Sequence, residues 1–208
     1  MNQPVPTLSV RAEPVQQRST ERITNLLDAA AELIDEHGID GLTTSDVATR
    51  SASSVGVVYR YFPNIQSLLR ALAARNMERF QARLGEVIDR ESTGWLSELD
   101  EAIDVYNDLT RTEPGFRALR FGDIIDERFI SPEVSNNSMI AERFNTLLIS
   151  KYGVAESEEL TFDLEVLVEI ADALLHRAFL FDPQGDDRFI ARLRTLAREH
   201  MAKYAPAS

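Results

Sequence analysis

The sequence predicts an all-α protein with a small N-terminal helix-turn-helix domain followed by a larger helical bundle. Apolar residues recur at spacings of three and four along most of the chain, which is the pattern of amphipathic helices. No stretch of any length alternates with period two, so no sheet is expected. The chain has 208 residues, of which 44% are hydrophobic, and this is enough to bury a sizeable core.

The N-terminal segment 1–19 contains three prolines and shows no helical period, so we expect a flexible arm there. A first helix is predicted from about Thr20, and Gly38 is expected to end it in the left-handed conformation. Its apolar stripe consists of Ile23, Leu26, Leu27, Ala30, Leu33 and Ile34.

Two short helices follow, separated by a tight turn. Thr43 and Asp46 have the spacing of a capping box, which predicts a helix from about Thr44 to Arg50. Ser54 can cap a second helix from Val55 to about Tyr61. Pro63 then ends this second helix, and a long helix is expected to begin near Asn64. Together with the first helix, these elements predict a helix-turn-helix domain over residues 20–75.

The rest of the chain, residues 76–208, is predicted to form one helical domain. Pro132, Gly153 and the segment 182–185 separate its later helices. The helices expected after the long one span Trp95 to Arg111, Pro114 to Phe121, Asp123 to Phe129, Glu133 to Tyr152, Ser157 to Phe181 and Asp186 to Tyr204.

The formal net charge is −12, and its distribution along the chain is uneven. Residues 18–75 contain 6 basic and 7 acidic side chains, whereas residues 76–208 contain 15 basic and 26 acidic ones. The first domain is thus close to neutral, so any affinity for nucleic acid must come from local placement of charge. With no cysteine, no signal-peptide pattern and no apolar stretch long enough for a bilayer, a soluble cytoplasmic protein is expected.

The segment Arg22–Leu72 resembles the DNA-binding domain of the tetracycline-repressor (TetR) family. Each motif is short, but their combined spacing is specific. The motifs are Leu26-Leu27-x-Ala29-Ala30, Gly38-x-x-Gly41-Leu42-Thr43, Asp46-Val47-Ala48 and Tyr59-Arg60-Tyr61-Phe62-Pro63.

This resemblance implies a homodimer that binds a palindromic DNA operator and has a helical regulatory domain whose ligand releases the DNA. It also implies that Thr44, Tyr59 and Tyr61 bind phosphate. Ala52 stands where the family usually has a turn glycine, and Ile65 replaces a phosphate-binding lysine. The full set of expected DNA-binding residues is Thr44, Ser54, Val55, Gly56, Val57, Tyr59, Arg60 and Tyr61. Arg18 and Arg22 are either additional phosphate contacts or ordinary solvated charges.

The second domain is expected to bind a small apolar effector between its helices, because sites of this kind in helical bundles are mostly apolar with a few polar groups. Neither a cofactor nor a metal ion is expected. The candidate ligand-binding residues are Trp95, Tyr106, Asn107, Phe121, Asp123, Phe144 and His176; His176 has the alternative role of a core histidine at a helix interface.

The last two helices are expected to form the dimer interface. The first of them is apolar on more than one side, and such a helix must be covered on more than one side. A single intrachain neighbour remains an alternative cover. The candidate interface residues are Ile170, Ala173, Leu174, Arg177, Leu180, Phe181, Leu193 and Leu196.

Two other functions remain open at this point. Glu169, Asp172 and His176 share one face of a predicted helix and could hold a divalent metal, as carboxylate-rich bundles do. No matching second ligand set and no glycine-rich phosphate loop accompany them, so catalysis is not expected. Alternatively, the near-neutral first domain could act as a protein-interaction module.

Overall fold

A computed structural model describes residues 13–88, 90, 94–119 and 136–204 of the chain. These described residues contain α-helices and one short 3₁₀ helix but no β-strand, which confirms the all-α prediction. The helices are α1 (Glu13–His37), α2 (Thr44–Arg50), α3 (Val55–Tyr61), α4 (Ile65–Ile88), α5 (Trp95–Thr112), α6 (Asn136–Tyr152), α7 (Glu158–Phe179) and α8 (Asp187–Met201), followed by the 3₁₀ turn Ala202–Tyr204.

The short helices α2 and α3 begin and end where their capping residues predict. The Thr43 side chain accepts a hydrogen bond from the backbone N–H of Asp46 (3.2 Å), and Ser54 accepts one from Val57 (3.3 Å). Gly38 ends α1 with a φ of 77°, as a helix-ending glycine does. Local hydrogen bonding therefore sets the bounds of these elements.

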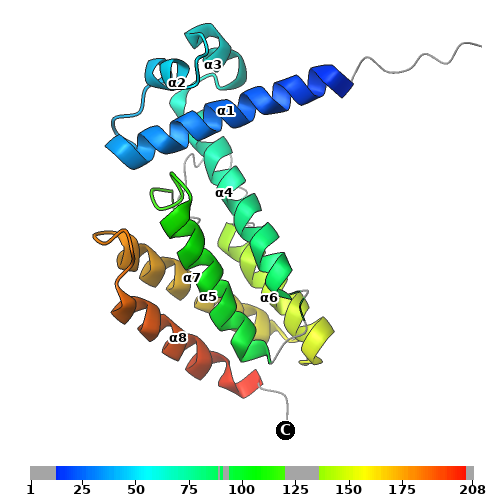
Figure 1. The fold of residues 1–208 in the computed structure, drawn as a ribbon. Helices are drawn as coiled ribbons and strands as arrows, with labels where there is room; N and C mark the ends of the chain where they lie inside the picture. The colour runs from blue at the N-terminus through cyan, green and yellow to red at the C-terminus, as the bar shows by residue number, and fades with distance from the viewer. Residues whose placement is uncertain (1–12, 89, 91–93, 120–135, 205–208) are drawn as a thin grey trace, which may run out of the picture.

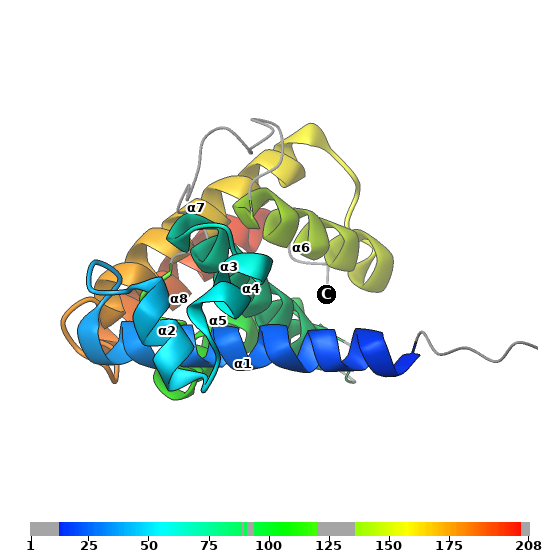
Figure 2. The ribbon, with the colours of Figure 1, turned by 90° about the horizontal axis from the view of Figure 1, so that it is seen from above.

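The described residues form two hydrophobic cores, and α4 contributes to both of them (Figure 1). Leu68 and Leu72, near the start of α4, pack with α1, α2 and α3 in the first core. Phe80 and Leu84, farther along, pack with α5 to α8 in the second core. Viewed from above, α2 and α3 lie across α1 and α4, and α5 to α8 lie beneath them (Figure 2).

Several parts of the chain differ from the sequence predictions. Helix α1 begins at Glu13, seven residues before the predicted start, so part of the expected arm is helical. The segment 114–119 forms turns instead of the predicted helix. The predicted helix over residues 123–129 lies outside the described residues. Among the described helices, none is long and apolar enough to span a membrane.

The turn 113–119 connects the two cores. Leu119 is buried in the first core, and Phe116 is buried in the second. Next to Phe116, Gly115, with a φ of 72°, lies against α1 so closely that a Cβ added to it would be 3.0 Å from both Cα and Cβ of Ala31. Two ion pairs, Arg117 with Asp35 (3.8 Å) and Arg79 with Glu113 (2.5 Å), flank this contact.

We expect Gly115→Ala to lower the free energy of unfolding by about 2–4 kcal/mol. The left-handed φ costs about 1 kcal/mol for any residue with a Cβ, and the overlap with Ala31 adds about 1–3 kcal/mol. Gly153→Ala is the matched control, because Gly153 has a similar φ of 67° but no atom within 4 Å of the added Cβ. Denaturant unfolding followed by circular dichroism measures both. Equal destabilisation of the two variants would contradict a tight contact at Gly115.

Candidate functional site

Helices α2 and α3 are joined by the turn Ser51–Ser54, in which Ala52 adopts the left-handed conformation with a φ of 51°. The hydroxyl of Ser51 donates to the carbonyl of Val47 (2.7 Å), and the backbone N–H of Ser53 donates to the carbonyl of Ala48 (2.9 Å). These bonds hold the turn tight although alanine stands at a position that favours glycine. The departure noted in the sequence thus leaves the helix-turn-helix geometry intact.

Arg50 fixes α2 against α1. Its guanidinium donates to both carboxylate oxygens of Glu36 (3.0 and 2.7 Å) and to Glu32 (3.1 Å). The hydrogen bonds from Arg50 hold the pKa of the Glu36 carboxyl below its usual value. This arrangement uses the single positive charge of Arg50 to hold two acidic side chains of α1 against α2.

Helix α3 buries Val58 in the first core and turns most of its other side chains outward. Tyr59 is 52% exposed, and its hydroxyl accepts a hydrogen bond from the Thr44 hydroxyl (3.3 Å), which joins the start of α2 to the C-terminal half of α3. Of the residues expected to bind DNA, Ser54, Val55, Gly56, Tyr59 and Arg60 are exposed, and Thr44, Val57 and Tyr61 are half-buried.

Gly56 and Arg60 lie on the outer surface of α3. A Cβ added at Gly56 would meet only the Ser54 hydroxyl, at 3.9 Å, so nothing within the chain requires a glycine at this position. Arg60 forms no ion pair with any residue that the structure describes, so its guanidinium is available to an external partner. Tyr61 is half-buried, and its hydroxyl accepts a hydrogen bond from the Ser19 hydroxyl (3.4 Å).

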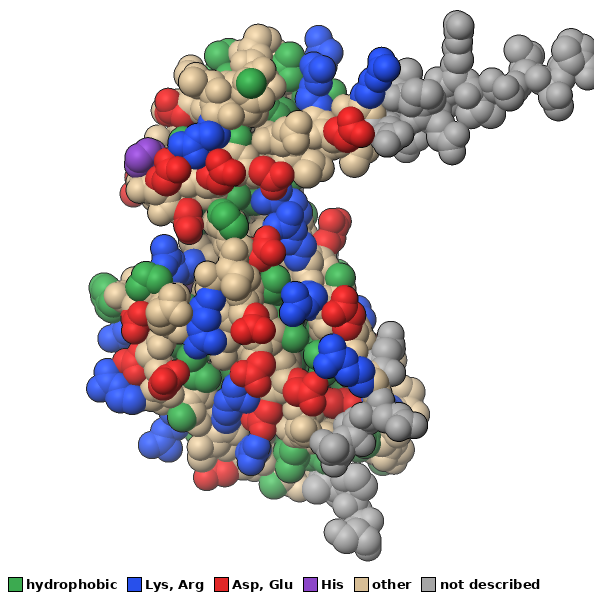
Figure 3. Space-filling view, viewed as in Figure 1, with side chains coloured by type: hydrophobic (Ala, Val, Ile, Leu, Met, Phe, Trp, Pro, Cys, Tyr) green, Lys and Arg blue, Asp and Glu red, His purple; other side chains and the backbone are tan. Residues whose placement is uncertain are grey.

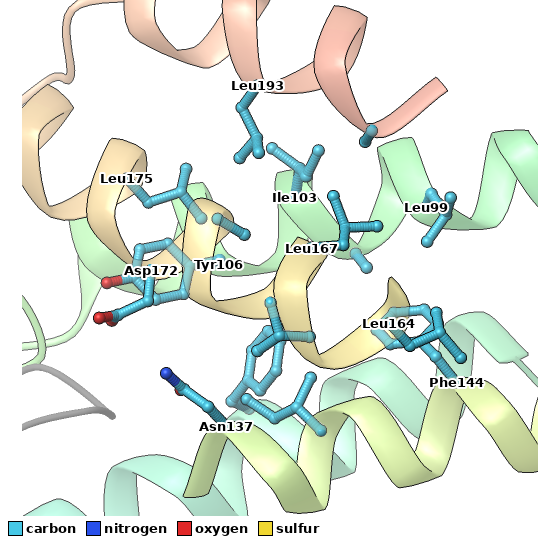
Figure 4. A pocket seen from close by; sticks show the side chains of 16 residues that line it. Leu99, Ile103, Tyr106, Asn137, Phe144, Leu164, Leu167, Asp172, Leu175 and Leu193 are labelled. Carbon is cyan, nitrogen blue, oxygen red and sulfur yellow. The ribbon is translucent and has the colours of Figure 1, made fainter. Parts of the chain in front are cut away.

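A cavity of about 80 Å³ lies within the second core (Figure 4). Its walls come from α5, α6, α7 and α8, with Phe80 of α4. Tyr106 and Phe144, both expected to bind ligand, line it, and leucines from α7 supply much of the remaining apolar surface. Asn137 and Asp172 bring polar side chains to one end, where Figure 4 shows them close together.

Three other predicted ligand-binding residues do not line this cavity. Trp95 is buried at the start of α5 as part of the second core. Asn107 is buried on α5 but does not reach the cavity wall, and His176 is half-buried near the end of α7. The remaining candidates, Phe121 and Asp123, lie outside the described residues.

The sequence analysis missed Asn137 as a cavity residue and assigned Asp172 only to a metal site. No three His, Asp or Glu side chains gather in a way that could hold a metal ion, as far as the described residues show. Glu169 instead accepts a hydrogen bond from the Asn137 amide (3.1 Å). The position of Asp172 within an otherwise apolar helix stripe was the available signal, because such a carboxylate must face the interior.

The outer side of α7 presents an apolar surface to solvent. Ala173, Arg177, Leu180 and Phe181 from the predicted dimer set are exposed, and Ile170, Leu174 and Leu196 are half-buried. The Arg177 guanidinium lies 5.0 Å from the ring centroid of Phe181 and 4.8 Å from that of Phe189. Phe162, which the sequence analysis did not place here, extends the surface and is 63% exposed.

One predicted dimer residue is wrong. Leu193 is fully buried within the chain and lines the cavity, so it cannot meet a second copy. Its helix, α8, carries one stripe that faces α5 and α7, and Leu193 belongs to that stripe.

Two family models together match most of the chain. A model described as the tetracyclin repressor-like C-terminal domain matches residues 93–205, and a model of bacterial regulatory proteins of the tetR family matches residues 26–72. The chain belongs to the TetR family. The match over residues 26–72 coincides with the helix-turn-helix, and the match over residues 93–205 contains every cavity-lining residue except Phe80.

Solved and curated relatives agree with this assignment. A TetR-family transcriptional regulator from Streptomyces coelicolor is 34% identical, with 88% of this chain and 99% of that one covered and a TM-score of 0.71. The HTH-type transcriptional repressor KstR from Rhodococcus jostii is 38% identical over 63 residues, which is 30% of each chain. The fold is also that of the transcriptional regulator FadR from Bacillus subtilis, solved with stearoyl-CoA (19% identity, 88% and 97% covered, TM-score 0.63).

If Tyr59 contacts a phosphate, Tyr59→Phe should weaken DNA binding roughly tenfold with little change in melting temperature. Its hydroxyl is exposed and bonded only to another exposed hydroxyl in the described structure, so its loss costs little in the free protein. A charge-assisted hydrogen bond contributes about 1.5 kcal/mol or more. Fluorescence anisotropy and thermal unfolding measure the two effects, with Tyr152→Phe on α6 as the control. A large loss of stability with unchanged affinity would make Tyr59 a structural residue.

Proposed function

We propose that this TetR-family protein is a transcriptional repressor that binds a palindromic operator as a homodimer and leaves it when a small apolar molecule enters the cavity. The observation that carries the proposal is the pair of capped short helices whose second member exposes Tyr59, Arg60 and Gly56. In helix-turn-helix proteins this second helix enters the major groove, and the first crosses the backbone.

The chemistry of the exposed surface suits duplex DNA. The hydroxyls of Thr44 and Tyr59 lie together, and hydroxyl groups are common donors to phosphate oxygens. Arg60 is available to donate two hydrogen bonds to a guanine edge, which is the commonest specific base contact. Small side chains at Ser54 and Gly56 allow the start of α3 to approach the bases.

The lining of the cavity supports an apolar effector. Most wall residues are aliphatic or aromatic, and the one charged side chain among them is the carboxylate of Asp172. A carboxylate opposes anions but accepts hydrogen bonds from hydroxyl or amine groups, and it can serve more than one donor at a time. The Bacillus subtilis FadR relative was solved with stearoyl-CoA, yet a volume of about 80 Å³ is far below what a long acyl chain fills.

The apolar outer surface of α7 supports a dimer. A palindromic operator presents two half-sites about 34 Å apart, so two recognition helices must be held at a fixed spacing. Phe162, Leu180 and Phe181 are each at least 49% exposed in the single chain, and large exposed apolar surfaces mark interaction sites.

Genomic footprinting with the purified protein tests the DNA-binding part of the proposal. A sharp palindromic site supports regulation of a nearby promoter. Uniform background binding would favour the alternative that the first domain contacts another protein. A reporter placed behind the footprinted site then separates repression from activation.

Ala171→Leu is expected to raise the effector concentration needed for operator release at least about tenfold without changing operator affinity. Ala171 lines the cavity, and the larger side chain fills part of its small volume. Ala74→Leu, at an exposed position of α4, is the control. Release is followed by anisotropy with a panel of neutral and cationic apolar compounds, nucleotides and sugar phosphates. Release of the wild-type protein by the phosphorylated compounds at micromolar concentration would refute an apolar effector.

Ala173→Arg should yield helical monomers that no longer bind the operator tightly. Ala173 is exposed on the apolar side of α7, and two arginines brought together across a two-fold axis would be desolvated and repel each other. Light scattering measures the mass, and circular dichroism checks the fold. Ala82→Arg on the exposed side of α4 is the control. If Ala173→Arg remains dimeric, the interface lies elsewhere.

A further inference from the structure

Four of the seven acidic side chains of residues 18–75 form ion pairs with arginines away from α3. Glu32 and Glu36 pair with Arg50, and Asp28 pairs with Arg75 (2.6 Å). A further acid on α1 pairs with the turn after α5. These pairs also occupy Arg50 and Arg75, so the positive charge that residues 18–75 present to a partner depends on the arginines that remain unpaired and not on the net charge of −1.

Arg18 and Arg22 behave differently from these paired arginines. Both are exposed on α1, one helical turn apart, and neither forms an ion pair with any described residue. Figure 3 shows basic side chains rising from the N-terminal part of α1 toward the level of α3, while acidic side chains gather along the lower side of α1. The charges of α1 are thus separated along its length and around its axis.

The two arginines line a groove of about 410 Å³ between α1 and the start of α3. Asn25 continues the α1 wall, because positions 18, 22 and 25 share one face of a helix. The opposite wall is the turn Ser51–Ser54 together with Val57 of α3. Most of the exposed lining is polar, and Glu21 is the only acid among the lining residues.

We infer that Arg18 and Arg22 form a second phosphate-binding site, which holds the DNA backbone alongside the start of α3. This inference rests on the proposed DNA-binding function. The protein groove includes Ser54 and Val57, which are also expected to enter the major groove of DNA. A phosphodiester strand borders the major groove on each side, so one strand would pass along the protein groove. Guanidinium groups bind phosphate oxygens through two parallel hydrogen bonds, which suits a passing backbone.

Salt dependence of operator binding tests the inference directly. Each phosphate neutralised by a cationic side chain contributes about 0.9 to the slope of log K against log salt. Arg18→Gln with Arg22→Gln should lower that slope by about two per subunit and weaken binding by at least about tenfold at 0.15 M salt. Arg18→Lys with Arg22→Lys keeps the charge and should largely restore the slope. Glu21→Gln removes the opposing carboxylate and should strengthen binding about twofold.

Arg83→Gln is the matched control, because Arg83 is an exposed arginine toward the far end of α4. Thermal unfolding of each variant excludes a general loss of structure. If the wild-type protein binds no DNA, the proposed function fails; if it binds but the glutamine pair leaves the slope unchanged, only this inference fails. A lower affinity with an unchanged slope would likewise overturn it, because the arginines would then act without displacing counterions.

Discussion

The central constraint in this molecule is that a single helix, α4, belongs to two hydrophobic cores. Its first turns pack under the helix-turn-helix, and Phe80 reaches the wall of the cavity. Interiors are close-packed, so a helix shared in this way transmits displacement instead of absorbing it. The turn 113–119 provides a second connection between the same two regions, through Gly115 and Leu119.

Tyr106 lies where these two connections meet. Its ring lines the cavity and packs edge-on against Phe80 (6.2 Å between centroids, 78°) and against Phe116 (5.6 Å, 72°). Phe80 lies on α4, whose first turns pack in the first core. Phe116 is next to Gly115, which packs against Ala31 of α1. A shift of one aromatic ring at the cavity therefore changes the packing on both routes to the DNA-binding domain.

The acidic bundle is held together by charges placed between its helices. Asp100 on α5 pairs with Arg194 (3.4 Å) and Arg198 on α8. Asp163 on α7 accepts hydrogen bonds from Lys203 and Tyr204, and these bonds hold the pKa of its carboxyl below the usual value. The excess acid of this half repels phosphate, so the field of the whole molecule favours an approach to DNA with the helix-turn-helix first.

The sequence was sufficient for the helix-turn-helix because its bounds depend on local capping. It was insufficient for segments whose conformation depends on tertiary contacts. Pro14 suggested an irregular arm, although proline is well tolerated in the first turn of a helix such as α1. Pro114 suggested the start of a helix, but the next residue takes a left-handed φ and packs on α1.

The sequence was also insufficient to assign the apolar residues of α7 and α8 to the core or to a dimer interface. Periodicity identifies which residues are apolar, but it does not distinguish a neighbour in the same chain from a second copy. Leu193 and Leu196 are three positions apart on one helix, yet the first lines the cavity and the second is half-exposed. The distinction depends on where α5 and α7 lie, which no single-helix pattern contains.

In the proposed function, the small size of the cavity couples effector binding to movement of the cavity walls. Sites for drug-sized ligands usually have volumes of about 300–1,000 Å³, so most effectors must displace part of the wall of this cavity. On one side, α7 packs closely against both α6 and α8, and in the proposed dimer its outer surface meets a second copy as well. The opposite wall, formed by Phe80 and Tyr106, is backed by α4 and the turn 113–119, which lead to the first domain. In the proposed mechanism, displacement in that direction moves the helix-turn-helix, because this wall of the cavity is the one connected to the first domain.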